Sequence, residues 1–250
     1  MVNDSKQIQV YNYKWITPFF TKNGALFTLT LVLLSFMSTL TAAVYVIPAQ
    51  GNRVGEVEYV EAEAGETLNE IGLRYDIGYN DMIKANPSLS KTQAFYNSIR
   101  VKIPAQFTLP NVPRRGLVID LNQYRLFYFP DNENVVYTYP VGIGRKGWST
   151  PVGKTKVIAK ERNPVWRPSV KLRGEAEQNG MLLPETFPAN VANPLGSFAL
   201  RLGWSSYLIH GTNRRDGIGM KVSAGCIRML PEDIEQLFSV VKVNTPVLIL

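Results

Sequence analysis

The chain has 250 residues, of which 45% are hydrophobic and 19% are charged, so it is long enough for one large or two smaller domains with a buried core. The formal net charge of +7 is spread along the sequence, which suits an anionic polymer or a membrane surface but also simple solubility. No stretch interleaves basic and aromatic residues as nucleic-acid-binding segments do, so nucleic acid is excluded as a partner.

The N-terminal region contains an apolar stretch, Gly24–Gln50, without a charged residue. Basic residues precede this stretch, and Glu56 and Glu58 follow it, an asymmetry that orients the N-terminus toward the cytoplasm. We expect residues 1–52 to be an export segment plus linker. It is either a signal peptide cleaved near "TAA" (41–43) or an uncleaved membrane anchor, with a buried core helix as the alternative. Export carries residues 53–250 across the membrane.

Residues 57–104 have the pattern of a small unit in the order strand, helix, helix, strand. "VEYVEA" (57–62) predicts a strand, and "TLNEIGLRY" predicts a helix with a capping box formed by Thr67 and Glu70. "NDMIKANP" predicts a second short helix that ends at the Asn86-Pro87 pair. "SIRVKIP" alternates as a closing strand up to Pro104.

This unit resembles a LysM domain, on the stretches "AGETLNEIGLRY", "MIKANP" and "VKIP". The resemblance implies binding of N-acetylglucosamine-containing glycans of peptidoglycan in a shallow groove. The groove would be lined by the loop after the first strand, which holds Gly65, Glu66 and Thr67, and by the loop before the last strand. The alternative is a helical spacer without a ligand.

The remainder of the chain is mainly β. The proline-rich stretch 105–114 predicts a linker to a second domain at 115–250. "RGLVIDL" and "YRLFYFP" predict a hairpin around Asn122-Gln123, and further strands are expected in "VVYTYPVGIG", "TPVGKTKVIAK", "GSFALRL", "SSYLIHG" and "NTPVLIL". One helix is expected from Pro231 onward. Residues 161–196 are rich in proline and show little regular pattern, which is typical of a lid over a site.

Cys226 and His210 are the only cysteine and the only histidine in the chain. A lone thiol in an exported protein suggests an intermolecular partner or a reactive group, and an imidazole can accept its proton so that the sulfur attacks a carbonyl. Gly225 leaves room for a substrate, and the amides of Gly225 and Cys226 could stabilise an oxyanion. Taken separately, a lone cysteine is more often a small buried side chain. Zinc is disfavoured, because three or four protein ligands are needed, and no metal or cofactor is expected.

"IHGTN" and "GIGMKVSAGCIRM", together with "TPVG" at 150–153, resemble the YkuD domain of L,D-transpeptidases over residues 115–250. The resemblance implies a β-sandwich in which Cys226 is the nucleophile and His210 the general base. By the same resemblance Ser223, Gly225 and Arg228 serve the oxyanion or the substrate, whereas Gly211 and Thr212 have no assigned role. Many relatives carry a second histidine where this chain has Ala224. The third member of the triad is often a backbone carbonyl group in this family.

The implied reaction begins on a peptidoglycan tetrapeptide stem, forms a cysteine thioester at the third residue and releases D-alanine. The acyl group then passes to an amine, either of another stem, giving a 3→3 cross-link, or of an outer-membrane lipoprotein. The order of anchor, LysM and YkuD domains resembles the periplasmic ErfK/YbiS/YcfS/YnhG-type subgroup, which implies a place in the periplasm or at the outer face of the inner membrane. A stem-peptide endopeptidase or carboxypeptidase and a non-catalytic wall-binding protein are the alternatives.

Overall fold

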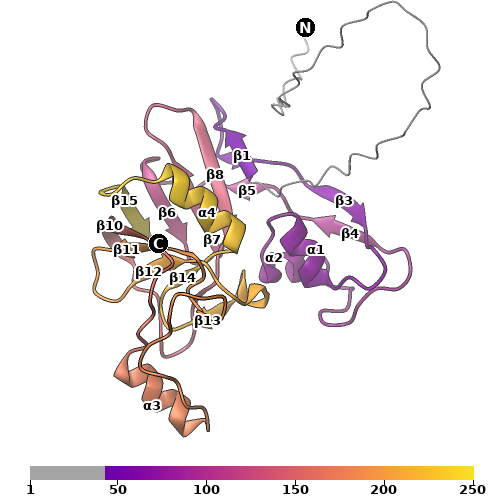
Figure 1. Ribbon diagram of the computed structural model, residues 1–250. Helices are drawn as coiled ribbons and strands as arrows, with labels where there is room; N and C mark the ends of the chain where they lie inside the picture. The colour runs from indigo at the N-terminus through magenta and orange to yellow at the C-terminus, as the bar shows by residue number, and fades with distance from the viewer. Residues whose placement is uncertain (1–42) are drawn as a thin grey trace, which may run out of the picture. The chain divides into compact units, whose positions relative to one another are not determined.

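A nine-stranded sheet is the framework of residues 43–250, the part of the chain that the computed structural model describes (Figure 1). Neighbouring strands are antiparallel except for the parallel pairs β6·β15 and β12·β14. The expected mainly β class is confirmed. In spatial order the strands are β1 (Ala43–Val46), β8 (Val135–Pro140), β7 (Arg125–Phe129), β6 (Gly116–Asp120), β15 (Pro246–Ile249), β10 (Gly153–Arg162), β11 (Phe198–Leu202), β12 (Leu208–His210) and β14 (Ile227–Arg228).

Strand β10 joins the two halves of this sheet. Its first residues, Gly153–Lys156, pair with β15, and its later residues, from Val157 onward, pair with β11. The register shifts between Val157 and Ala159, and such a bulge lets one strand bend from one half of a sheet into the other. The predicted β-sandwich is therefore a single sheet that curls at β10, since side chains from both halves meet in one hydrophobic core.

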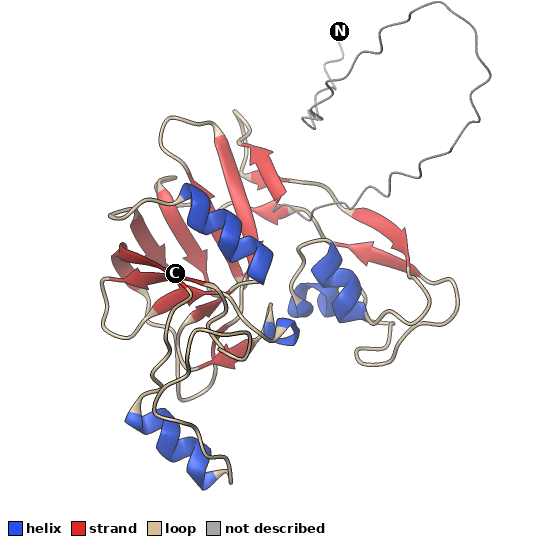
Figure 2. Cartoon of the chain, in the orientation of Figure 1, coloured by secondary structure: helices blue, strands red, loops and turns tan. Residues whose placement is uncertain are grey.

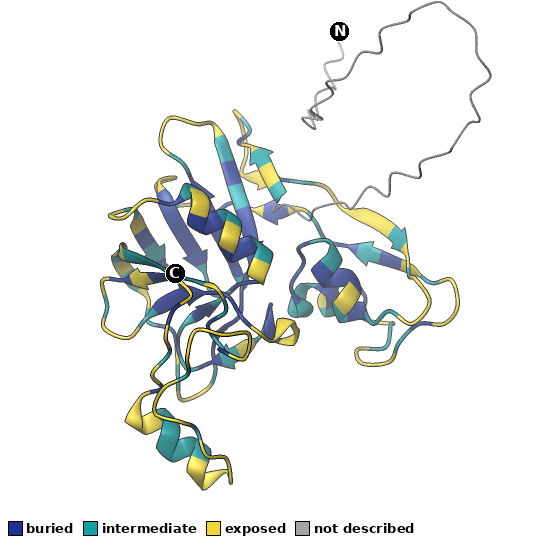
Figure 3. Ribbon diagram, viewed as in Figure 1, coloured by how far each residue is buried: buried dark blue, intermediate teal, exposed yellow. Residues whose placement is uncertain are grey.

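Strands β6 and β7 are buried on both faces, which explains why their sequences are continuous apolar runs. On one face, Leu117 and Leu126 belong to a core that also includes Leu237 of helix α4 (Pro231–Val240). On the other face, Val118 and Phe127 belong to a second core with residues of the N-terminal unit. Figure 2 shows α4 and the α1–α2 pair beside these strands, and Figure 3 shows the strands as mostly buried.

The N-terminal unit has the predicted order of elements. It consists of β3 (Glu58–Glu61), α1 (Leu68–Arg74), α2 (Tyr79–Ala85) and β4 (Arg100–Ile103), and β3 pairs antiparallel with β4. The predicted capping box is present, because the Glu70 amide donates to Thr67 Oγ1 at 3.3 Å and the Thr67 amide donates to the Glu70 carboxylate at 2.8 Å. Leu68, Ile71 and Met82 are fully buried in the second core.

The segments on either side of this unit also pack onto the body. Residues 43–46, which the sequence places in the export segment, form β1 and pair with β8. Strand β2 (Arg53–Val54) pairs with β5 (Phe107–Thr108), and the neighbouring Leu109 is only 1% exposed. The stretch 105–114, predicted to be a linker, thus contains a paired strand and a buried leucine. Within residues 43–250 no helix is long and apolar enough to cross a bilayer, and residues 24–42 of the apolar stretch lie outside the described residues.

The proline-rich stretch 161–196 contains a helix that the sequence pattern did not predict, α3 (Val170–Gln178). The helix begins at Ser169, whose hydroxyl accepts the Leu172 amide. None of its residues is buried, so it has no apolar stripe that a periodicity search can find. Two short elements complete the fold near the site: β9 (Ile143–Gly144), which pairs with β13 (Lys221–Ser223), and a 3-10 turn at Arg215–Gly217.

Candidate active site

His210 is the last residue of a strand at the edge of the sheet, and Cys226 lies in the bend directly before the neighbouring strand. Strand β12 ends at His210, and β14 begins directly after Cys226 and runs parallel to β12, with His210 opposite Arg228. Ile209 and Ile227 point into the core, so their neighbours along each strand face the other way. The side chains of His210 and Arg228 therefore share one face of the sheet, and the charge of Arg228 is close enough to act on the thiol of Cys226.

A backbone carbonyl group orients the imidazole. His210 is 4% exposed, and its Nδ1 lies 2.6 Å from the carbonyl oxygen of Gly211. Because that oxygen can only accept, Nδ1 carries the hydrogen and donates it, so Nε2 holds the lone pair of the neutral ring. Burial, and then the positive charge of Arg228, lower the pKa of His210 to about 3, against the opposing effect of backbone hydrogen bonds with Gly211 and Leu195. The ring is therefore neutral at physiological pH and can accept a proton at Nε2.

The thiol of Cys226 is protonated in its resting environment. Burial raises the pKa of Cys226. A hydrogen bond with the backbone of Leu208 and the charge of Arg228 lower it by a smaller amount. Its Sγ lies 3.6 Å from the carbonyl oxygen of Ser206, to which it donates. Within residues 43–250 no hydrogen bond joins the thiol to the imidazole. The thiol is therefore bonded to the Ser206 carbonyl oxygen and is not engaged with the imidazole in this structure.

The turn before the nucleophile is fixed by Ser223. The Ser223 hydroxyl donates to the Cys226 carbonyl oxygen at 2.6 Å and accepts the Gly225 amide at 3.1 Å. Gly225 has a φ of +101°, a left-handed conformation that strains other residues, and a side chain there would also meet the Tyr207 ring. Ser223 is therefore a support of the turn. The Gly225 amide, expected to stabilise an oxyanion, is already occupied by Ser223 in this structure.

The loop 145–150 lies beside this turn, and its contribution was not predicted from the sequence. Thr150 Oγ1 donates to the Gly225 carbonyl oxygen at 2.9 Å and accepts the Gly144 amide at 3.0 Å. The Arg145 amide donates to the Ser223 carbonyl oxygen at 2.9 Å. Thr150 is the first residue of the "TPVG" motif. The sequence did not indicate that the Thr150 hydroxyl holds the turn before the nucleophile.

Arg228 supplies an unpaired positive charge next to the thiol. Within the described residues its guanidinium group makes no hydrogen bond or ion pair, and its Nε is buried without a partner. Burial and the nearby Arg214 and Arg145 lower the pKa of Arg228, whereas the neighbouring Cys226 and Asp216 raise it. A partly buried guanidinium without an acidic partner is suited to bind a carboxylate of a ligand.

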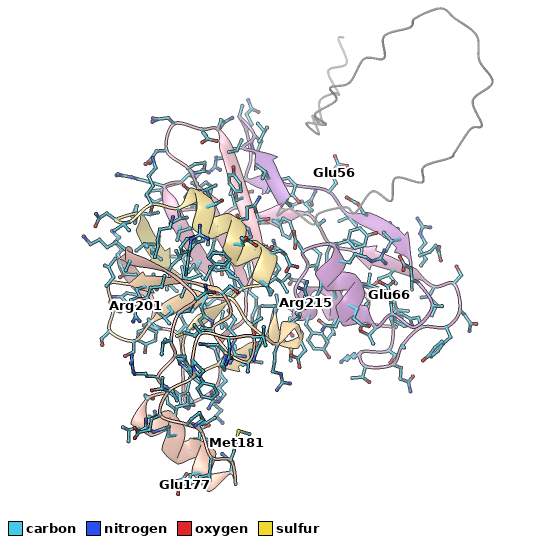
Figure 4. The ribbon with its side chains drawn as sticks, viewed as in Figure 1. Glu56, Glu66, Glu177, Met181, Arg201 and Arg215 are labelled. Atoms are coloured by element: carbon cyan, nitrogen blue, oxygen red, sulfur yellow. The ribbon has the colours of Figure 1, made fainter. Side chains whose placement is uncertain are left out.

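The loop expected to bind glycan lies at the seam between the N-terminal unit and the 3-10 turn that follows His210. Glu66 and Thr67 line a cavity of about 580 Å³ whose other wall contains Arg215 and Asp216. Figure 4 shows Glu66 on the N-terminal unit and Arg215 between that unit and the sheet. The Glu66 carboxylate accepts a hydrogen bond from Arg74 at 2.8 Å, and Gly65 has a φ of +91° without a close neighbour.

The sequence of the chain is similar to that of known proteins. The family model of the YkuD L,D-transpeptidase catalytic domain matches residues 114–249. The chain is 40% identical to the probable L,D-transpeptidase YcfS of Escherichia coli K12 over 80% of this chain and 64% of the relative. It is 38% identical to the probable L,D-transpeptidase YbiS of the same strain, over 90% of this chain and 74% of the relative.

The probable L,D-transpeptidase ErfK/SrfK of Salmonella typhimurium is 37% identical over 94% of this chain and 74% of the relative. Among solved structures, the catalytic domain of an E. faecium L,D-transpeptidase covers 56% of this chain and 100% of that chain, at 20% identity and a TM-score of 0.44. The chain thus spans about two thirds to three quarters of the length of these curated relatives. From the family model and the curated relatives together, the chain belongs to the L,D-transpeptidase family defined by the YkuD catalytic domain.

Proposed function

We propose that the protein is a cysteine acyltransferase that acts on peptidoglycan tetrapeptide stems. The observation that carries this proposal is that Cys226 directly precedes β14 and His210 ends the adjacent strand β12, with Nδ1 of the imidazole bound to the Gly211 carbonyl oxygen. This arrangement has the three parts of an activated nucleophile: a thiol, a base and a group that orients the base. The orienting group is a carbonyl oxygen rather than a carboxylate.

In the first half of the reaction, the thiol proton moves to Nε2 of His210 and Sγ attacks the carbonyl carbon of the third stem residue. The bond between that carbon and the nitrogen of the terminal D-alanine then breaks. The imidazolium returns its proton to the departing amine, so D-alanine leaves as a neutral amine and a thioester remains on Cys226. The Cys226 amide is the proposed oxyanion donor, and the Gly225 amide joins it once Ser223 releases it.

In the second half, an acceptor amine attacks the thioester carbon and gives its proton to His210, which protonates the departing sulfur. A stem amine gives a 3→3 cross-link, and a lysine amine of an outer-membrane lipoprotein gives attachment of that lipoprotein. Arg228 is the proposed partner for a carboxylate of the donor stem, since its guanidinium has no acidic partner within the described residues. Such a contact would hold the scissile carbonyl group near Sγ.

The N-terminal unit, residues 57–104, is the proposed glycan-binding LysM module. Its strand, helix, helix, strand order and the exposed loop at Gly65 support this assignment. The remaining proposals are export through the apolar stretch Gly24–Gln50, by a cleaved signal or an uncleaved anchor, and residence in the periplasm or at the outer face of the inner membrane.

The test is incubation of the full chain with tetrapeptide-bearing muropeptides and an added amine, followed by mass spectrometry of the products. We expect free D-alanine together with 3→3 dimers or amine-exchanged stems. Cys226→Ala should abolish both products while glycan binding is retained. Products that are only hydrolysed would favour the endopeptidase or carboxypeptidase, and binding without turnover would favour a wall-binding protein.

A further inference from the structure

Residues 167–186, which include helix α3, form a segment that projects from the sheet (Figure 1). A bridge closes its base, where Trp166 and Phe187 exchange backbone hydrogen bonds and their rings stack with centroids 4.9 Å apart. Beyond this bridge the segment exposes large apolar side chains, such as Val170 at 76% and Leu182 at 84%. Because α3 has no buried residue, hydrophobic burial does not hold it against the body.

The carboxylate of Glu175 binds the segment 167–186 to the rest of the molecule. Glu175 accepts hydrogen bonds from the Arg145 guanidinium and from the Trp148 indole nitrogen. Within residues 43–250, these are the hydrogen bonds and ion pairs that join 167–186 to the body. Lys171 adds a cation–π contact, with its ammonium group 4.4 Å from the centroid of the Trp148 ring. The Arg145 and Trp148 hydrogen bonds also lower the pKa of Glu175, which keeps it ionised at neutral pH.

Arg145 and Trp148, which bind Glu175, belong to the loop 145–150, and this loop contacts the turn that holds the nucleophile. A β-carbon at Gly225 would lie 3.5 Å from the Ser149 carbonyl oxygen and 3.6 Å from that of Trp148. Thr150 at the end of the loop holds the Gly225 carbonyl oxygen, and the Arg145 amide holds that of Ser223. A displacement of Arg145 or Trp148 would therefore shift the Ser223–Cys226 turn, because the two segments are in direct contact.

We propose that Glu175 is a positioning residue: its bonds to Arg145 and Trp148 tie helix α3 to the loop 145–150 and so set the position of this loop beside the Ser223–Cys226 turn. The assignment rests on the proposed acyl transfer for its functional consequence, but the mechanical link can be measured without turnover. Glu175 does not touch the reacting atoms, so its loss changes how a peptide donor is held and leaves the chemistry of the thiol unchanged.

The test compares Glu175→Ala and Glu175→Gln with Glu177→Gln in the full-length protein. Glu177 lies on the same helix, is exposed and points away from the body (Figure 4). We expect Glu175→Ala to lower kcat/KM for a tetrapeptide donor by about ten- to a hundred-fold, chiefly through KM. Glu175→Gln keeps an acceptor for Trp148 and should recover part of the loss. The rate of alkylation of Cys226 by iodoacetamide should be unchanged in all three variants.

Unchanged kcat/KM in Glu175→Ala, an equal loss in Glu177→Gln, or a parallel loss of alkylation would each overturn the proposal. Hydrogen–deuterium exchange separates this failure from failure of the proposed function. If the wild type shows no turnover, the acyltransferase proposal fails. The mechanical link is retained if exchange at 145–150 rises in Glu175→Ala alone, and it is overturned if exchange there equals that of the wild type.

Discussion

Since His210 is the only histidine in the chain, NMR can follow its protonation without assignment of other rings. Burial and the charge of Arg228 lower the pKa of His210 to about 3, so the ring stays neutral from pH 5 to pH 8. We expect the Cε1 proton of untagged protein to keep a constant chemical shift over this range. A midpoint near the ordinary histidine pKa of about 6.5 would show an exposed ring and contradict the buried base.

Among single residues, the sequence could identify those whose type is chemically rare. Cys226 and His210 stood out because each occurs once, and the structure places them at the neighbouring strands β14 and β12, Cys226 directly before the first and His210 at the end of the second. The carbonyl oxygen of Gly211 and the hydroxyl of Thr150 could not be recognised, because any residue has a carbonyl group and a threonine in a loop has no characteristic pattern. Glu175 was hidden for the same reason: it is one of many acidic side chains until the fold brings Arg145 to it.

Secondary-structure elements were predictable where a local rule determines them. The capping box at Thr67 and the alternating or continuous apolar runs depend on neighbours in the sequence, and the structure has these helices and strands. Helix α3 depends on a polar N-cap and a distant ion pair instead of an apolar stripe. Strand β1 lies at the end of the apolar stretch Gly24–Gln50, where composition suggested export, and only its pairing with β8 reveals a strand.

The C-terminal end of helix α1 holds a buried carboxyl group. Asp76 is 6% exposed with a φ of +55°, and burial, together with the charge of Glu232, raises its pKa to about 6 against the attraction of Arg125 and Arg215. Because the folded-state pKa lies above the unfolded value of 3.8, the folded protein binds more protons between the two values. The wild type therefore loses stability as the pH rises from about 4 to about 6.

We expect Asp76→Asn to remove this loss, because asparagine does not ionise and tolerates the left-handed conformation. The free energy of unfolding at pH 8 should increase by about 1–3 kcal/mol, and the gain should vanish toward pH 4. Urea denaturation at several pH values measures the gain in the free energy of unfolding at pH 8 and its decrease toward pH 4. Asp131→Asn, at a carboxylate 78% exposed, is the control and should change little. A variant less stable than the wild type at pH 8 would contradict the argument.

At the scale of the whole molecule, the N-terminal unit shares a core with the catalytic sheet. The second core joins Leu68 and Met82 of the helices to Val118 and Phe127 of the sheet. The sequence predicts two domains joined by a proline-rich linker, and a shared core could not be predicted, because contacts between distant segments leave no local pattern. The unit and the sheet are instead expected to unfold together, as a single cooperative transition.

Arg125 is the polar centre of this junction, and its replacement tests the shared core. The guanidinium is 1% exposed, donates to the Asp76 carbonyl oxygen at 2.6 Å and to Thr138 Oγ1 at 3.1 Å, and lies 3.7 Å from the centroid of the Phe107 ring. Arg125→Met leaves these groups without their partner and should cost about 3–5 kcal/mol. Calorimetry of Arg125→Met should show one transition at a lower Tm. The control Arg201→Met removes an exposed ion pair, and its Tm should be close to that of the wild type. Two transitions, of which Arg125→Met moves one, would instead show that residues 57–104 fold independently.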